Sequence, residues 1–158
     1  MEYFVICFCL AITLHNIEEA IWLPEWSQQA TKFQKSVTPG EFRFAVIIIT
    51  VFAYLAAFTF LFVPQSNIAK WTFIGFLGSM IINAIFPHLL ATIVMKTYAP
   101  GLITGLLLNI PINSMILFQL FESQVIEYKE LIISTVVVGG CLLALIPLLF
   151  KIGRKVSY

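Results

Sequence analysis

The amino-acid sequence predicts an all-α protein, an integral membrane bundle of five transmembrane helices that forms one domain over residues 1–158. Composition predicts the membrane, because 60% of the residues are hydrophobic and 11% are charged, whereas a soluble domain carries about 25% charged residues. Segment length predicts the helices, since five apolar stretches approach the roughly 20 residues that span a hydrocarbon core. Short links between the later stretches predict antiparallel packing of sequential helices.

The first predicted span covers residues 3–23. The polar connection that follows, residues 24–40, contains Trp26 and Phe33. Aromatic rings favour the depth of the lipid head groups, so we expect this connection to lie along the membrane interface. The remaining spans are predicted at residues 42–63, 68–95, 101–121 and 131–150.

Basic residues predict the orientation of the bundle. Five antiparallel spans place six of them on the side of the C-terminal tail, with Arg43 at the edge, and leave only Lys70 and Lys129 on the other side. The six are Lys32, Lys35, Lys96, Lys151, Arg154 and Lys155. Because basic residues concentrate in cytoplasmic loops, the N-terminus is predicted outside and the C-terminus inside.

A polar group interrupts the first span, in the stretch L-H-N-I-E-E-A-I-W. His15, Glu18 and Glu19 are spaced i, i+3 and i+4, so they share one face of a helix. A charged carboxylate at the bilayer centre costs on the order of 3 kcal/mol, and two adjacent carboxylates also repel each other. We therefore expect that one carboxyl group keeps a proton or that the pair binds a cation.

The second histidine is predicted at the same depth as the first. His15 and His88, the only histidines in the chain, each lie eight residues from the inner ends of their spans, Leu23 and Lys96, which is about 12 Å along the helix axis. The third and first spans run in the same direction. The two histidines are therefore expected to meet near the inner leaflet.

Amide and hydroxyl side chains are expected to complete this pocket. Asn83 lies on the third span, while the fourth span brings Thr104 to a similar level and Asn109 somewhat deeper. A purely structural interpretation also stays open. Glu18 and Glu19 lie about 6–7 Å from the predicted helix end, close enough to reach the head groups, although a helix C-terminus disfavours carboxylates.

Three short motifs occur in order along the chain: H-N-I-E-E at 15–19, N-A-I-F-P-H at 83–88 and P-G-L-I-T at 100–104. With these motifs the chain resembles the HXXEE-domain family of small membrane proteins, which is functionally uncharacterised and suspected to consist of membrane enzymes. The mainly prokaryotic distribution of that family implies the cell membrane of a prokaryote. The motif positions are His15, Glu18, Glu19, Asn83, His88, Pro100, Gly101 and Thr104.

The first functional hypothesis is a metal-dependent integral membrane enzyme that acts on a lipophilic substrate. The predicted ligands of the divalent metal are His15, Glu18, Glu19 and His88. This mixed nitrogen and oxygen set suits zinc or non-haem iron with an open coordination position. A carboxylate that does not bind the metal would act as general base. The residues expected to orient ligands or substrate are Asn83, Thr104 and Asn109.

Two alternatives stay open. In the first, Glu18 or Glu19 forms a proton pair with His88 in a metal-free isomerase or cyclase for an isoprenoid-like or sterol-like substrate. In the second, the same residues serve non-enzymatic transport or binding of protons or cations. The net charge of +1, without a basic stripe among aromatic residues, excludes nucleic acid as a partner. Membrane lipids and a lipophilic small molecule are expected instead.

Overall fold

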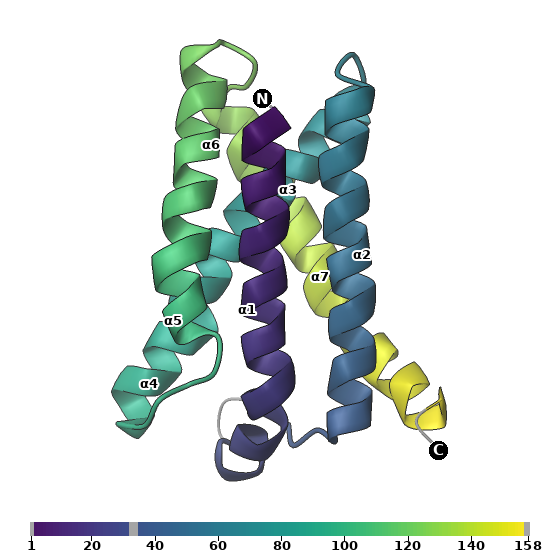
Figure 1. Cartoon of the computed structure of the whole chain (residues 1–158), viewed down its shortest axis with the longest axis vertical. Coiled ribbons are helices and arrows are strands. Elements are labelled where there is room, and N and C mark those ends of the chain that lie inside the picture. Colours follow the sequence, from purple (N-terminus) through teal and green to yellow (C-terminus); the bar gives the residue numbers. More distant parts are fainter. Residues whose placement is uncertain (1, 32–34, 157–158) are drawn as a thin grey trace.

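The computed structural model describes residues 2–31 and 35–156, and all regular structure within these ranges is helical (Figure 1). The helices are α1 (Glu2–Gln29), α2 (Pro39–Phe62), α3 (Asn67–Asn83), η1 (Ala84–Leu89), α4 (Leu90–Met95), α5 (Leu102–Thr104), η2 (Gly105–Asn109), α6 (Ile110–Glu122) and α7 (Tyr128–Val156). The π-helical segments η1 and η2 join their neighbours end to end. The five resulting rods are long and apolar enough to cross a membrane, which confirms the five-helix, all-α prediction.

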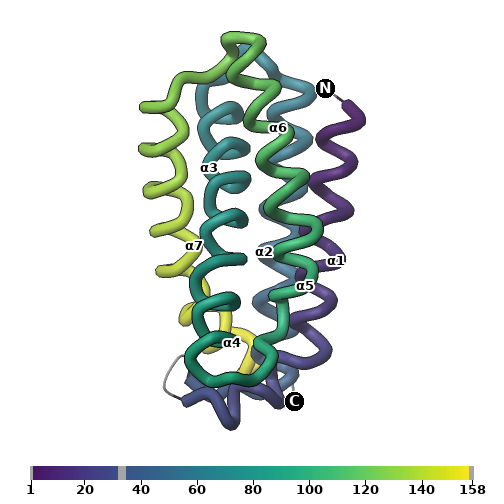
Figure 2. Tube along the Cα trace, turned by 90° about the vertical axis from the view of Figure 1, so that its left-hand side faces the viewer, coloured from purple at the N-terminus to yellow at the C-terminus, as the bar shows by residue number. Residues whose placement is uncertain are grey.

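The rods run alternately up and down, so the two termini lie at opposite ends of the bundle (Figures 1 and 2). Helix α3 packs against α2, α6 and α7, while α1 packs against α2 and α6. The connections after α1 and after α4 lie at the same end as the C-terminus (Figure 1). We call this the lower end. Lys32 and Phe33, which entered the predictions above, lie outside the described residues.

The predicted end of the first span at residue 23 is wrong, because α1 continues through Pro24 to Gln29. A proline inside a helix leaves the carbonyl four residues earlier without its N–H partner. Here Arg43 Nε donates to the Ala20 carbonyl at 3.3 Å. This contact compensates for the missing backbone bond, and the first part of the predicted interfacial connection is therefore helical.

Helix α2 begins earlier than predicted because Thr38 caps it. Thr38 Oγ1 accepts a hydrogen bond from the Glu41 N–H at 3.3 Å, and the Glu41 carboxylate accepts one from the Thr38 N–H at 2.8 Å. This reciprocal capping box satisfies two backbone donors at the helix start. Pro39 occupies the first turn, where a missing N–H has no cost.

An apolar core fills the bundle away from its polar residues. The ring of Phe73 lies edge-on to Phe8 at a centroid distance of 5.2 Å and stacks on Phe60 at 4.9 Å. Leu77 and Leu120 are fully buried in the same cluster. We use the name apolar core for the cluster around these five side chains.

Small residues on α3 let α7 approach closely. A Cβ added to Gly75 would lie 2.5 Å from a Val138 methyl group, and one added to Gly78 would lie 2.0 Å from Thr135 Oγ1. Small residues at helix contacts are typical of bundles packed in lipid, where close backbone approach increases van der Waals contact.

Candidate metal centre

The third rod changes its backbone conformation just before the second histidine. Phe86 is extended, with φ −129° and ψ 115°, inside the π-helical segment η1, and the Phe86–Pro87 peptide is cis. Irregular backbone at membrane depth is tolerated where it is enclosed by protein or faces a cavity. At this position the chain brings His88, only 4% exposed, into the bundle.

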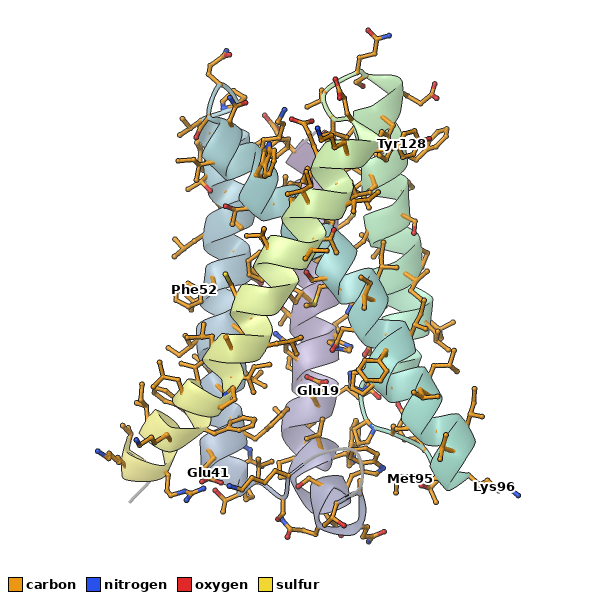
Figure 3. All side chains as sticks on the ribbon, turned by 180° about the vertical axis from the view of Figure 1, so that it is seen from behind. Glu19, Glu41, Phe52, Met95, Lys96 and Tyr128 are labelled. Atoms are coloured by element: carbon orange, nitrogen blue, oxygen red, sulfur yellow. The ribbon has the colours of Figure 1, made fainter. Side chains whose placement is uncertain are left out.

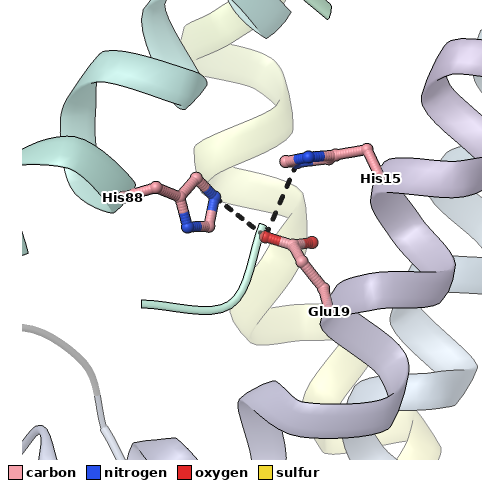
Figure 4. A group of neighbouring side chains, drawn as sticks. All are labelled: His15, Glu19 and His88. Carbon is pink, nitrogen blue, oxygen red and sulfur yellow. Dashed lines mark ion pairs between the residues drawn. The ribbon is translucent and has the colours of Figure 1, made fainter. Parts of the chain in front are cut away.

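The structure brings both histidines and one glutamate together (Figure 4). Glu19 Oε1 lies 2.9 Å from His88 Nε2 and 3.7 Å from His15 Nε2. The two imidazole rings are 5.4 Å apart between centroids and nearly perpendicular. One ligand atom from each of the three residues lies within 4.8 Å of the others. We call His15, Glu19 and His88 the candidate metal centre.

The centre does not lie at the end of the helix. Glu19 is farther from the lower end of the bundle than Glu41, Met95 and Lys96 (Figure 3). Helix α1 continues ten residues past Glu19 to Gln29, or about 15 Å. The side chain of Glu19 is only 13% exposed. Glu19 therefore lies farther from the helix end than the roughly 6–7 Å expected from the sequence.

Glu18 points to a different set of partners than its neighbour. Its carboxylate accepts the backbone N–H groups of Gly101 at 2.8 Å and Thr104 at 3.0 Å. It also accepts the hydroxyl groups of Thr104, at 2.5 Å, and of Tyr98. The structure thus divides the predicted ligand set, because these four donors tie Glu18 to the segment from Tyr98 to Thr104 and leave Glu19 with the histidines.

Thr104 links Glu18 to His15. A threonine hydroxyl has one hydrogen, and the 2.5 Å contact with the Glu18 carboxylate uses it. The same oxygen lies 3.1 Å from His15 Nδ1, so it must accept the Nδ1–H of that ring. His15 Nε2 then carries a lone pair and faces the candidate metal centre, which is the tautomer that a metal requires.

Asn83 lies between the two imidazole rings. Its carboxamide nitrogen is 3.2 Å from His15 Nε2 and 3.1 Å from His88 Nε2. His88 Nε2 also contacts the Glu19 carboxylate, which when ionised can only accept a hydrogen bond. The same nitrogen would therefore have to accept a hydrogen bond from Asn83 and donate one to Glu19 at once. If the oxygen and nitrogen of the Asn83 amide are exchanged, the amide oxygen instead faces His15 Nε2. That nitrogen has no hydrogen to donate in the tautomer that the Thr104 contact favours, so the conflict moves to His15. With neutral histidines and ionised glutamates these contacts cannot all be hydrogen bonds at once, and one extra proton or a bound cation would resolve the conflict.

Gly101 provides the close approach of the backbone to this centre. It adopts φ 92°, a conformation that residues with a Cβ rarely occupy. A Cβ at Gly101 would lie 2.8 Å from His88 Cε1 and 3.0 Å from His15 Cε1. Glycine is therefore required twice, once for the turn before α5 and once for the space between the two rings.

Two further polar residues are Tyr98 and Asn109. Tyr98, which was not among the predicted site residues, binds Glu18, and burial together with this hydrogen bond raises the pKa of its phenol to about 12. Its position two residues before the motif P-G-L-I-T is the only sequence signal. Asn109, predicted to orient ligands or substrate, is 1% exposed, and its side-chain amide has no hydrogen-bond partner among the described residues.

These features define a class of protein: a small five-helix bundle of membrane-protein type with a buried histidine–glutamate centre at a break in one helix. The chain belongs to the HXXEE family, whose model, described as "Protein of unknown function with HXXEE motif", matches residues 6–116. It is similar to the "Uncharacterized protein YrkK" of Bacillus subtilis (strain 168), with 73% identity over 157 residues, 99% of each chain. No solved structure matches significantly. The family match includes the whole candidate metal centre and ends before α7.

Proposed function

We propose that this protein is a metal-dependent integral membrane enzyme that acts on a lipophilic substrate. His15, Glu19 and His88 would hold one divalent ion, zinc or ferrous iron. The observation that carries the proposal is the convergence of three ligand atoms within 4.8 Å in the interior of an apolar bundle. Intramembrane ionisable residues are costly, and they mark functional sites by default.

The donor set fits such an ion. Two imidazole nitrogens and one carboxylate leave a coordination position free, as catalytic zinc sites and non-haem iron sites do. Ligand atoms on one zinc ion lie within about 4 Å of each other at bond lengths of about 2.0–2.1 Å. Small side-chain rotations would therefore close the three residues around an ion. A bound cation would also resolve the conflict among the contacts around Asn83.

The surrounding residues would prepare the ligands. Glu18 would act on His15 through Thr104 and keep the Nε2 lone pair directed at the position of the metal, an arrangement that commonly raises metal affinity. With Glu19 on the metal, Glu18 is the carboxylate left to exchange a proton with substrate, with Tyr98 as its partner. A bound metal would supply Lewis-acid activation of a substrate oxygen or of water.

The proposal includes the membrane and the orientation. The five apolar rods would cross the cell membrane of a prokaryote. The lower end would face the cytoplasm, because it contains the connections and the tail that carry most of the basic residues. The candidate metal centre would then lie toward the inner leaflet.

A metal-free enzyme is the second candidate, and one distance favours it. Glu19 Oε1 and His88 Nε2 are 2.9 Å apart, so a proton shared between them would also resolve the conflict around Asn83. Such a pair would suit an isomerase or cyclase that moves one proton on an isoprenoid-like or sterol-like substrate.

One experiment separates the two candidates. Purified protein is incubated with an unfractionated bacterial lipid extract, with and without a chelator, and the lipids are analysed by mass spectrometry. The metal enzyme predicts a converted species that disappears with the chelator, returns when metal is restored and is absent in Glu19→Gln. Conversion that persists after complete metal removal would overturn the metal proposal in favour of the proton pair.

A further inference from the structure

A groove of about 670 Å³ runs along α1, outside the candidate metal centre. Its other wall is the segment from Tyr98 to Leu108. This volume falls within the range of about 300–1,000 Å³ that is usual for small-molecule sites. Glu18 and Thr104 belong both to the groove wall and to the contacts that position His15. The groove is therefore continuous with the proposed catalytic site.

The groove changes from apolar to polar along α1. The part nearer the N-terminus of α1 is lined by Leu14 and Ile17 together with Leu108 from the opposite wall. The part nearer the lower end is lined by Glu25, Trp26 and Gln29. A ligand with an apolar chain and a polar head group would match this gradient.

The charges in the groove restrict the head group. Glu18 and Glu25 are acidic, and none of its described lining residues is basic. A phosphate or carboxylate head would face like charge, which costs affinity. At this end the Gln29 amide could hydrogen-bond a hydroxyl group, while Glu25 would attract an amine.

We propose that the groove binds the substrate as a single-chain amphiphile whose head group carries no negative charge, a long-chain alcohol or amine. This inference rests on the proposed function. The head group lies near Glu25 and Trp26, the chain lies against Leu14 and Ile17, and at the level of Ile17 it passes Glu18 and Tyr98. Glu18 is about 10 Å from Glu25 along the helix, so the catalytic residues would act on the chain several carbons away from the head group.

The groove tryptophans give a direct test. The chain has three tryptophans, and Trp22 and Trp26 line the groove, whereas Trp71 bonds to Glu130 at the far end of the bundle. In a Trp71→Phe background, fluorescence reports on the groove alone. The protein is placed in phosphatidylcholine nanodiscs and titrated with chain-brominated stearyl alcohol, stearylamine or stearic acid, whose bromine quenches nearby tryptophan.

The proposal predicts saturable quenching by the alcohol and the amine, at concentrations about tenfold lower than for the acid because of like-charge repulsion. Filling the groove with Ile17→Phe or Ile21→Phe should remove saturation. Ile6→Phe is the matched control, because Ile6 is an exposed residue of the same helix outside the groove. Linear quenching that is equal for all three probes and unchanged by filling the groove would reveal simple partitioning and overturn the proposal.

Metal content measured on the same samples separates the two proposals. Bound metal without saturable quenching overturns only the groove assignment. Saturable quenching without metal supports the groove as a ligand site and contradicts the metal-dependent function. A preference for stearic acid overturns the head-group assignment directly.

Discussion

The apolar core and the candidate metal centre lie in one small bundle but differ in backbone conformation and in the side chains they contain. Around Phe8 and Phe73 the helices are regular, and aromatic and aliphatic side chains fill the interior. Around His15 and His88 the backbone departs from the α-helix, in η1, in η2 and in the turn at Gly101. Regular helices satisfy every backbone group internally, so irregular segments in an apolar bundle need another purpose.

Residues of the apolar core contribute to stability, whereas residues around the candidate metal centre are arranged to form a site. Packing in the apolar core needs size and shape, and volume-conserving changes are tolerated there. The candidate metal centre depends on individual atoms: one hydroxyl hydrogen of Thr104, one lone pair of His15 and one missing Cβ at Gly101. Substitutions around the candidate metal centre should therefore have larger effects than volume-conserving substitutions in the apolar core.

The largest effect is expected for Gly101→Ala. The new methyl group would overlap the rings of both histidines, so divalent metal affinity should fall by about 100-fold, the upper end of the range for loss of groups that orient ligands. Isothermal titration calorimetry measures the loss. Gly140→Ala is the control, because a Cβ there meets nothing within 4 Å. Equal metal affinity in both variants would contradict the role of Gly101.

Glu18→Gln should produce the next largest effect. The amide no longer offers two carboxylate oxygens to the donors of Gly101, Thr104 and Tyr98, so His15 loses the control of its tautomer. We expect metal affinity to fall about 10–100-fold, and nitrogen NMR of the imidazole should show a mixture of His15 tautomers. Glu25→Gln, a change on the same helix, should alter neither. An unchanged His15 spectrum in Glu18→Gln would show that the link through Thr104 does not operate.

Tyr98 gives a smaller, pH-dependent effect. Its pKa is raised from 10.0 to about 12 by burial and by the hydrogen bond to Glu18. A raised pKa means that the folded state prefers the neutral phenol, so this stabilisation is complete below pH 10 and is lost as the pH rises toward 12. The ultraviolet difference spectrum between wild type and Tyr98→Phe isolates this titration. In Glu18→Gln the pKa of Tyr98 should move back toward 10. A pKa of Tyr98 that already lies near 10 in the wild type would contradict the hydrogen bond between Tyr98 and Glu18.

The smallest effect is expected for Asn113→Leu on α6. Asn113 is fully buried, but neither of its side-chain polar atoms has a partner among the described residues. Replacing an unpaired buried amide by an apolar group of similar size is nearly neutral or stabilising, by about 1 kcal/mol or less. Asn83→Leu, by comparison, removes the contact to both histidines and should lower metal affinity. Thermal unfolding in detergent measures the stability of Asn113→Leu. A clear loss of stability would show that the Asn113 amide has a stabilising hydrogen-bond partner.

The sequence predicts the five rods well because length and hydropathy determine them almost alone. The predicted end of the first rod was wrong at Leu23, because the contact between Arg43 and the Ala20 carbonyl is tertiary and leaves no local signal. Counting residues from helix ends still brought His15 and His88 together.

The roles of the two glutamates could not be separated from sequence. Glu18 and Glu19 are adjacent and chemically identical, and only the direction of each side chain decides which one meets the histidines. That direction depends on the turn at Gly101, whose N–H binds Glu18. The positive φ of this glycine, its place between two rings and the contact of Tyr98 are all tertiary features. The motifs identify the region of the site, while the structure divides it into ligands and supporting residues.

Metal content tests the central claim most directly. Wild-type protein is purified in mild detergent without chelator, reconstituted with zinc or ferrous iron and analysed by inductively coupled plasma mass spectrometry. Glu19→Gln is measured beside Glu122→Gln, a change at an exposed position outside the candidate metal centre. The account predicts about one divalent ion per chain in the wild type and in Glu122→Gln, and its loss in Glu19→Gln. A folded wild-type protein that retains no stoichiometric metal after reconstitution would contradict it.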